Sequence, residues 1–350
     1  MCICKTLKIS ILKSLIVLVA IVCTCNEGIR GQDTHLSQMW ISPITSNPAV
    51  AGFFEGTARI GGYYRTQWRA ISKPYMTAGV YSDFALKKRP RQKDIFSMGV
   101  TLEYDMAGDS KFSTAQGNLI LAYAHAINGN NDHFLMGGVS FGGVQRTWDY
   151  SQLKFDEQYI DGQYNPNVPL SEVFARRSFF FMDCAAGIQW AYRVNTKCFL
   201  SAGFSVYHLN MPRISLYKDD NIRMPILYSA QFNSTFVVQK SNELSPMIYY
   251  RKQAQYQELL FGLMYSYVFH FDSKWYINKF NFGIYHRWKD ALFVSIGGLW
   301  RDVHFGLCYD FNVSKLSKAS RARGSFEINV SYIIKTHHVP KPKSIPCYLF

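Results

Sequence analysis

Residues 323–335, RGSFEINVSYIIK, alternate between apolar and polar side chains along almost their whole length. The apolar parity holds Phe326, Ile328, Val330, Tyr332 and Ile334, and the polar parity holds Ser325, Glu327, Asn329 and Ser331. Successive side chains of a β-strand point to opposite faces, so the alternation predicts a strand with one apolar face. That face meets either the core of a soluble sheet or, in a transmembrane barrel, the lipid.

The same alternation recurs throughout the chain after Thr57. It predicts fourteen strands, most of them long enough to cross a membrane with tilt, and an even number is what a single-chain bacterial barrel requires. The alternation is weakest in the ninth and eleventh segments. The predicted strands are 59–68, 75–84, 95–106, 112–126, 133–146, 178–192, 196–209, 225–239, 244–251, 258–269, 279–288, 291–300, 303–312 and 324–335. We therefore expect an all-β fold, a transmembrane antiparallel up-and-down β-barrel of the outer-membrane type, over residues 57–335.

The predicted connections differ in length according to the parity of the strand that they follow. The three longest, 147–177, 210–224 and 312–323, all follow odd-numbered strands. Short turns such as 194–197 and 301–303 follow even-numbered strands. Outer-membrane barrels have short periplasmic turns and long extracellular loops, whereas a secreted β-sandwich has no reason to sort its loops in this way.

The composition agrees with a membrane barrel. Aromatic residues make up 16% of the 350 residues, with 23 Tyr and 26 Phe, and barrels place aromatic girdles at both membrane interfaces. The mean hydropathy is only −0.09, as expected when half of each strand is polar. After residue 31, no run approaches the roughly 18 consecutive apolar residues of a transmembrane helix. We therefore expect the protein in the outer membrane of a Gram-negative bacterium.

The ends of the chain carry different signals. Residues 1–31 have lysines followed by the apolar run 15–25, which is typical of a secretory signal peptide, with cleavage between Gly31 and Gln32. We expect residues 32–56 to form an N-terminal periplasmic or plug-like segment. Residues 336–350 lack periodicity and are predicted to be a periplasmic tail.

The charges indicate what the interior contains. The formal net charge is +14, but the basic residues are dispersed and no nucleic-acid-binding motif accompanies them, so no nucleic-acid partner is expected. Charged residues lie on the polar parity of several predicted strands, and a charge facing lipid would cost several kcal/mol, so they should face the lumen. These residues are Arg59, Arg65, Glu103, Asp105 and Asp183.

One short pattern is reminiscent of a hydrolase. Residues 138–142, GVSFG, match the G-x-S-x-G nucleophile elbow, which functions only at a sharp strand-to-helix turn. Here the motif lies inside a glycine-rich predicted strand, and the histidines are dispersed without metal-ligand spacing. We predict no catalytic, cofactor or metal site, and a barrel lipase that uses Ser140 remains an alternative.

Four stretches together resemble a known family. They are 32–53 (QDTHLSQMWISPITSNPAVAGF), 59–68 (RIGGYYRTQW), 207–212 (YHLNMP) and 306–332 (GLCYDFNVSKLSKASRARGSFEINVSY), and in this order they resemble the PorP/SprF family of Bacteroidetes. The motif positions taken as site residues are Asn47, Pro48, Gly52, Arg59, Tyr64, Arg65, Gln67, Trp68, Asn210, Pro212, Gly324, Phe326 and Glu327.

The resemblance implies a non-enzymatic outer-membrane component of the type IX protein secretion system. Its expected role is export or surface anchoring of cargo proteins such as adhesins, which in gliding species serve motility, through the loops of the barrel. The implied partners are outer-membrane lipid, the C-terminal domain of a secreted cargo protein and periplasmic components of the secretion machine, and no cofactor is implied. The alternative is a passive porin or small-molecule transporter.

Overall fold

The computed structural model describes most of the chain from Leu36 to Lys335. The described ranges are 36–40, 42–69, 73–86, 94–108, 111–128, 132–149, 155–160, 163–165, 167–168, 177–215, 221–239, 241–269, 277–314, 320–321 and 323–335. The predicted signal peptide, its cleavage position at Gly31 and Gln32, and the predicted tail 336–350 lie outside these residues.

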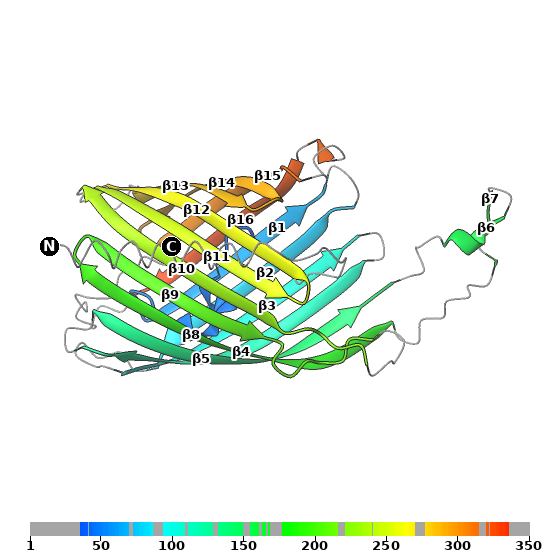
Figure 1. The fold of residues 1–350 in the computed structure, drawn as a ribbon, viewed down its shortest axis with the longest axis horizontal. Helices are drawn as coiled ribbons and strands as arrows, with labels where there is room; N and C mark the ends of the chain where they lie inside the picture. The colour runs from blue at the N-terminus through cyan, green and yellow to red at the C-terminus, as the bar shows by residue number, and fades with distance from the viewer. Residues whose placement is uncertain are drawn as a thin grey trace, which may run out of the picture.

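Within the described residues, fourteen antiparallel strands form one closed barrel, in which each strand pairs with its neighbours in the chain and β1 pairs with β16 (Figure 1). The strands are β1 (Ala58–Gln67), β2 (Tyr75–Ala85), β3 (Asp94–Ala107), β4 (Phe112–Ala126), β5 (His133–Thr147), β8 (Ser178–Asn195), β9 (Cys198–Tyr207), β10 (Leu227–Gln239), β11 (Asn242–Gln253), β12 (Tyr256–Val268), β13 (Ile277–Arg287), β14 (Ala291–Trp300), β15 (Val303–Asn312) and β16 (Arg323–Ile334). The predicted up-and-down barrel is confirmed.

The two faces of each strand are sorted as a membrane requires. In β16, the side chains of Phe326, Ile328 and Val330 are exposed on the outside, whereas Ser325 and Glu327 are buried in the interior. The same parity holds for β1, where Ile60 is exposed and Arg59 is buried. The apolar faces of the strands therefore form the lipid-contacting surface of the barrel, and the polar faces line its lumen.

The long connections gather at one end of the barrel. The connections 148–177, 208–226 and 313–322 follow β5, β9 and β15, whereas two-residue turns follow β8, β10 and β14 at the other end. Long loops are extracellular in outer-membrane barrels, which assigns the right-hand end of Figure 1 to the outside. The first long loop contains a small hairpin that the sequence did not predict, formed by β6 (Tyr159–Ile160) and β7 (Gln163–Tyr164) after a turn of 3₁₀-helix, η2 (Asp156–Gln158).

The pairing of β10 with β11 is interrupted. Asn233 is opposite Met247 and Phe236 is opposite Leu244, but the ladder is broken between these pairs, where Pro246 lacks an N–H group. On the lumen side, the hydroxyls of Thr235 and Ser245 are 3.0 Å apart and hydrogen-bonded.

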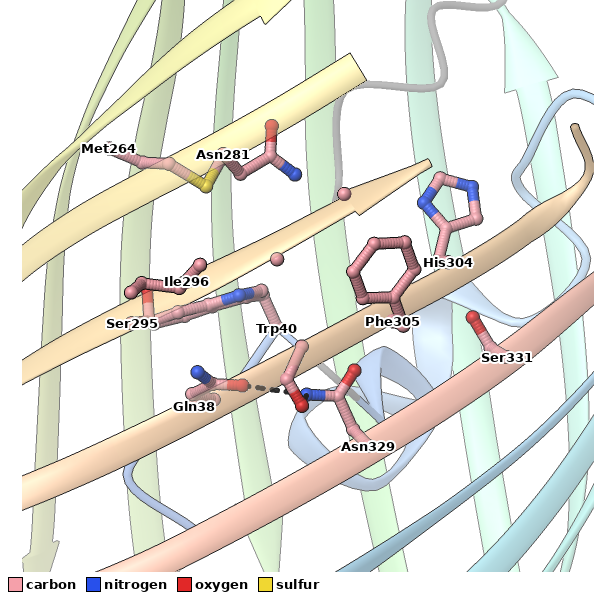
Figure 2. A pocket seen from close by; sticks show the side chains of 13 residues that line it. Gln38, Trp40, Met264, Asn281, Ser295, Ile296, His304, Phe305, Asn329 and Ser331 are labelled. Atoms are coloured by element: carbon pink, nitrogen blue, oxygen red, sulfur yellow. Dashed lines mark hydrogen bonds between the residues drawn. The ribbon is translucent and has the colours of Figure 1, made fainter. Parts of the chain in front are cut away.

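Two short helices precede the first strand. They are α2 (Pro43–Ser46) and η1 (Pro48–Val50), and they belong to residues 36–40 and 42–54, which lie inside the barrel and are called the N-terminal segment below (Figures 1 and 2). Among the described helices, none has the length and apolarity to cross a membrane. The N-terminal segment determines which parts of the lumen remain open.

Candidate functional site

The N-terminal segment packs against the inner wall of the barrel through apolar side chains. Ile44, Val50 and Ala51 are almost fully buried, and the rings of Phe53 and Phe134 are in edge-to-face contact with centroids 5.1 Å apart. The wall residues that pack against the segment include Tyr63, Tyr81, Ile95, Ile120, Ala122, Ala124, Ala126 and Met136. These residues give the lumen an apolar patch where the segment docks.

The start of the segment is held by carboxylates in the extracellular half of the barrel wall. The backbone N–H groups of Ser37 and Gln38 donate to the carboxylate of Glu327 at 2.6 and 3.1 Å. The hydroxyl of Ser37 donates to Asp310 Oδ2 at 2.6 Å and accepts from Arg287 Nη2 at 3.0 Å. Glu327 and Asp310 come from the last two strands, so the first described residues depend on the end of the chain.

Arginines balance these carboxylates. Arg65 Nη1 is 3.1 Å from Glu327 Oε1, and Arg287 Nε donates to Glu258 Oε1 at 3.2 Å. Both guanidinium groups also approach Asp310 Oδ2, at 3.9 and 3.8 Å. These five side chains are 3% exposed or less, and buried charges are tolerated only when paired and hydrogen-bonded in this way.

A second ion pair holds the segment near its end. Arg59 Nε and Nη2 donate to the two carboxylate oxygens of Asp83 at 2.8 and 2.7 Å, and Gly52 N donates to Asp83 Oδ2 at 2.8 Å. The guanidinium carbon of Arg59 lies 4.6 Å from the centre of the Phe54 ring, within cation–π distance. Asp83 thus joins β1, β2 and the segment in one buried contact.

The middle of the segment is positioned by Asn47. Its side-chain oxygen accepts from Ala49 N at 3.0 Å and caps η1, while its amide nitrogen donates to the carbonyl of Ile188 at 3.0 Å. Pro48 follows and lies directly against β5 at Gly138, where an added Cβ would be 2.5 Å from the Pro48 carbonyl. Glycine is therefore required at this position so that the backbone of the segment can approach the wall.

Above the segment lies a cavity of about 880 Å³, called the vestibule below. Many of its lining residues come from the extracellular ends of the strands, for example Gln67 at the end of β1 and Tyr256 at the start of β12. Leu36, Met39 and Pro48 of the segment form its floor. The vestibule therefore ends on the N-terminal segment.

A much smaller pocket of about 40 Å³ lies between the segment and the wall formed by β12 to β16 (Figure 2). In Figure 2 the amides of Gln38 and Asn329 point toward each other, and the Asn329 nitrogen donates to Gln38 Oε1 at 2.9 Å. The Trp40 ring packs on Tyr285 with centroids 4.5 Å apart. A pocket of this volume has room for only about two or three water molecules.

The structure brings together some of the motif positions named from the sequence. Asn47, Pro48, Gly52, Arg59, Arg65 and Glu327 all take part in holding the N-terminal segment. Gln67 adjoins them, since its Oε1 accepts from Arg65 at 3.2 Å.

Other motif positions lie elsewhere. Tyr64 and Phe326 are exposed on the outer face. Asn210 donates to the carbonyl of Met182 at 2.7 Å in the connection after β9, where Pro212 also lies. Gly324 is the second residue of β16 and lies next to the Asp310 backbone. The predicted strand 59–68 extends one residue too far, since Trp68 follows β1 with φ of 59° and lines the vestibule.

The residues with possible chemistry are dispersed. Ser140 is in the middle of β5 with its side chain in the lumen, and β8 follows β5 in the barrel, so the strand-to-helix turn of a nucleophile elbow is absent from this part of the described chain. Among the described residues, no three His, Cys, Asp or Glu side chains are grouped so as to hold a metal ion.

Sequence reasoning missed several residues that hold the segment, including Ser37, Asp83, Arg287 and Asp310. Asp83 and Asp310 lie on the polar parity of their strands, which was the available signal. Their partners could not be assigned, because hydrogen bonds such as Ser37 to Asp310 join residues 273 positions apart.

The closed antiparallel barrel, with an apolar outer face and a charged interior, defines a β-barrel protein of the bacterial outer membrane. The chain belongs to the PorP/SprF family of type IX secretion system membrane proteins, whose family model matches residues 29–332. It is therefore a non-enzymatic membrane component of that secretion system, as the resemblance implied.

Solved structures with a similar fold are outer-membrane channels. The toluene transporter TbuX of Ralstonia pickettii is 10% identical with a TM-score of 0.50, over 85% of this chain and 94% of that one. The deltaS2 mutant of the monoaromatic hydrocarbon channel TodX gives the same identity, TM-score and coverage. At such identity the similarity shows the fold alone. A search of curated proteins found no match.

Proposed function

We propose that this protein acts in the secretion system as a closed surface receptor, which exports or anchors cargo proteins such as adhesins through the extracellular loops and the vestibule. The single observation that carries this proposal is the N-terminal segment inside the lumen, held by Glu327 at one end and Asp83 at the other. A barrel filled in this way offers a binding surface at one end instead of a passage.

The loops support the same proposal. The hairpin of β6 and β7 lies beyond the extracellular end of the barrel (Figure 1) and exposes Tyr159, Ile160 and Tyr164. Tyrosine with small polar residues is typical of adaptable contact surfaces. The C-terminal domain of a cargo protein would dock here, and periplasmic components of the secretion machine would contact the opposite end.

The processing of the chain belongs to this proposal. Cleavage between Gly31 and Gln32 would leave four residues before Leu36, so residues 32–56 would act as the plug and residues 336–350 as a periplasmic tail. Mass spectrometry of the mature N-terminus tests the cleavage position.

The function is tested by copurification from gently solubilised outer membranes. We expect the wild-type protein to retain a secreted protein, and a variant with residues 150–176 replaced by a short Gly-Ser turn to lose it. A matched replacement in the periplasmic turn at 301–302 serves as the control. Retention of the same protein by the loop variant, or its absence from the wild type, would refute the proposal.

The second candidate is a passive porin, favoured only by the fold shared with channels. If the protein is a porin, the unmodified barrel should conduct ions strongly. If the N-terminal segment fills the lumen, its conductance should be low.

A further inference from the structure

The vestibule differs in charge from the chain as a whole. Carboxylates enter its wall from three strands and from the turn after β13: Glu103, Asp105, Asp183, Glu258 and Asp290. The guanidinium groups of its lining are Arg65, Arg146, Arg251 and Arg287. Carboxylates are thus in excess here, in a protein whose formal net charge is +14.

Two of these guanidinium groups are already paired with carboxylates. Arg65 is paired with Glu327 and approaches Asp310, and Arg287 is paired with Glu258 and Asp290. Counting Asp310 and Glu327, which the same arginines neutralise, increases the excess of carboxylates. A ligand in the vestibule would therefore meet a negative potential, which the low-dielectric walls of a concave site concentrate.

Two carboxylates on separate parts of the wall face this space, and each has a hydrogen-bonding side chain beside it. Asp105, near the end of β3, accepts from the Thr77 hydroxyl at 2.6 Å. Asp183, near the start of β8, is 3.0 Å from Nδ1 of His208. Both side chains line the vestibule and retain acceptor capacity for a ligand, because an ionised carboxylate has about four lone-pair sites.

Aromatic rings at the same end add a second attraction for cations. Trp68 and Tyr75 line the vestibule in edge-to-face contact, with ring centroids 4.8 Å apart, and Tyr256 lines it from β12. A cation over the face of Trp or Tyr is attracted by the electrostatic quadrupole of the ring.

We propose that the vestibule binds a cationic segment of the secreted partner, with lysine or arginine side chains placed between Asp105 and Asp183. This proposal rests on the proposed receptor function and adds the charge of the segment that the vestibule would bind. Because the N-terminal segment closes the floor, the bound segment is a chain end or a loop that enters and leaves at the extracellular side. An acidic segment would face the carboxylate excess and be repelled.

Fluorescence anisotropy of the full-length protein in detergent tests this, with labelled hexalysine and hexaglutamate peptides as probes. We expect hexalysine to bind more tightly than hexaglutamate, and more weakly at 300 mM than at 50 mM salt. The double substitution Asp105→Asn and Asp183→Asn should weaken hexalysine binding at least tenfold. Asp302→Asn, at the periplasmic turn after β14, is the matched control and should leave binding unchanged.

Equal binding of the two peptides, or hexalysine binding that the double variant leaves unchanged, would overturn the proposal. The heat-dependent shift of the folded barrel on a gel shows that each variant is folded. The two proposals fail separately. A cargo protein that copurifies with the double variant as with the wild type refutes the cationic site alone, whereas a wild type without cargo refutes the receptor function.

Discussion

At the scale of single residues, Asp83 has the most concentrated role, since it accepts hydrogen bonds from Arg59 and from the backbone of Gly52 in a fully buried position. We predict that Asp83→Asn destabilises the barrel by about 3–5 kcal/mol, because it leaves the Arg59 guanidinium buried without its counter-charge. The midpoint of urea unfolding in lipid vesicles measures this. Ser82→Ala, at the neighbouring lipid-facing position, is the control, and equal midpoints for the two variants would contradict the assigned role.

Adjacent glycines provide a matched pair of substitutions. A methyl group at Gly138 would be 2.5 Å from the carbonyl of Pro48, whereas at Gly137 it would meet nothing within 4 Å. We therefore expect Gly138→Ala to push the N-terminal segment off β5 and to raise the ion conductance of the barrel in a planar bilayer. Gly137→Ala should behave as the wild type, and a similar effect of both changes would show that this contact is unimportant.

At the scale of strands, the interrupted pairing opposite Pro246 should be visible in exchange measurements. We predict that the amide hydrogen of Ser234 exchanges faster than that of Phe232, because both N–H groups point toward β11 but only Phe232 lies where β10 and β11 pair regularly. Pro246→Val restores an N–H donor and should slow this exchange. Hydrogen–deuterium exchange with mass spectrometry makes the comparison. Uniform protection along β10 would show that the pairing of β10 with β11 is not weakened opposite Pro246.

The strands were largely predictable from the sequence because each carries its own period-two pattern, independent of its neighbours. Even the weakest segments, 244–251 and 279–288, correspond to β11 and β13. Boundaries were less accurate: β8 continues to Asn195, three residues beyond its predicted end. The hairpin of β6 and β7 was missed, since strands of two residues are too short to show a period. The contacts around Glu327 and Asp83 were not predictable, because they depend on how the segment docks in the closed barrel.

At the scale of the whole molecule, the N-terminal segment determines whether the lumen conducts. We predict that the unmodified protein gives little single-channel current in a planar bilayer, and that deletion of residues 32–54 opens steps of high conductance. The physical reason is that the segment fills the lumen beneath the vestibule. Excision of 150–176 is the control and should leave the current low. Large steps from the unmodified protein would instead favour the porin.

The hydrogen bond from Ser37 to Glu327 spans 290 positions of the chain, nearly its full length. Ser37 and Gln38 can therefore bind Glu327 only after the final hairpin has been delivered and β16 has joined β1. During folding, these two residues must remain without this contact until then, and the barrel must close around them. A folding factor that inserts hairpins one by one would thus finish with an interior that is already occupied.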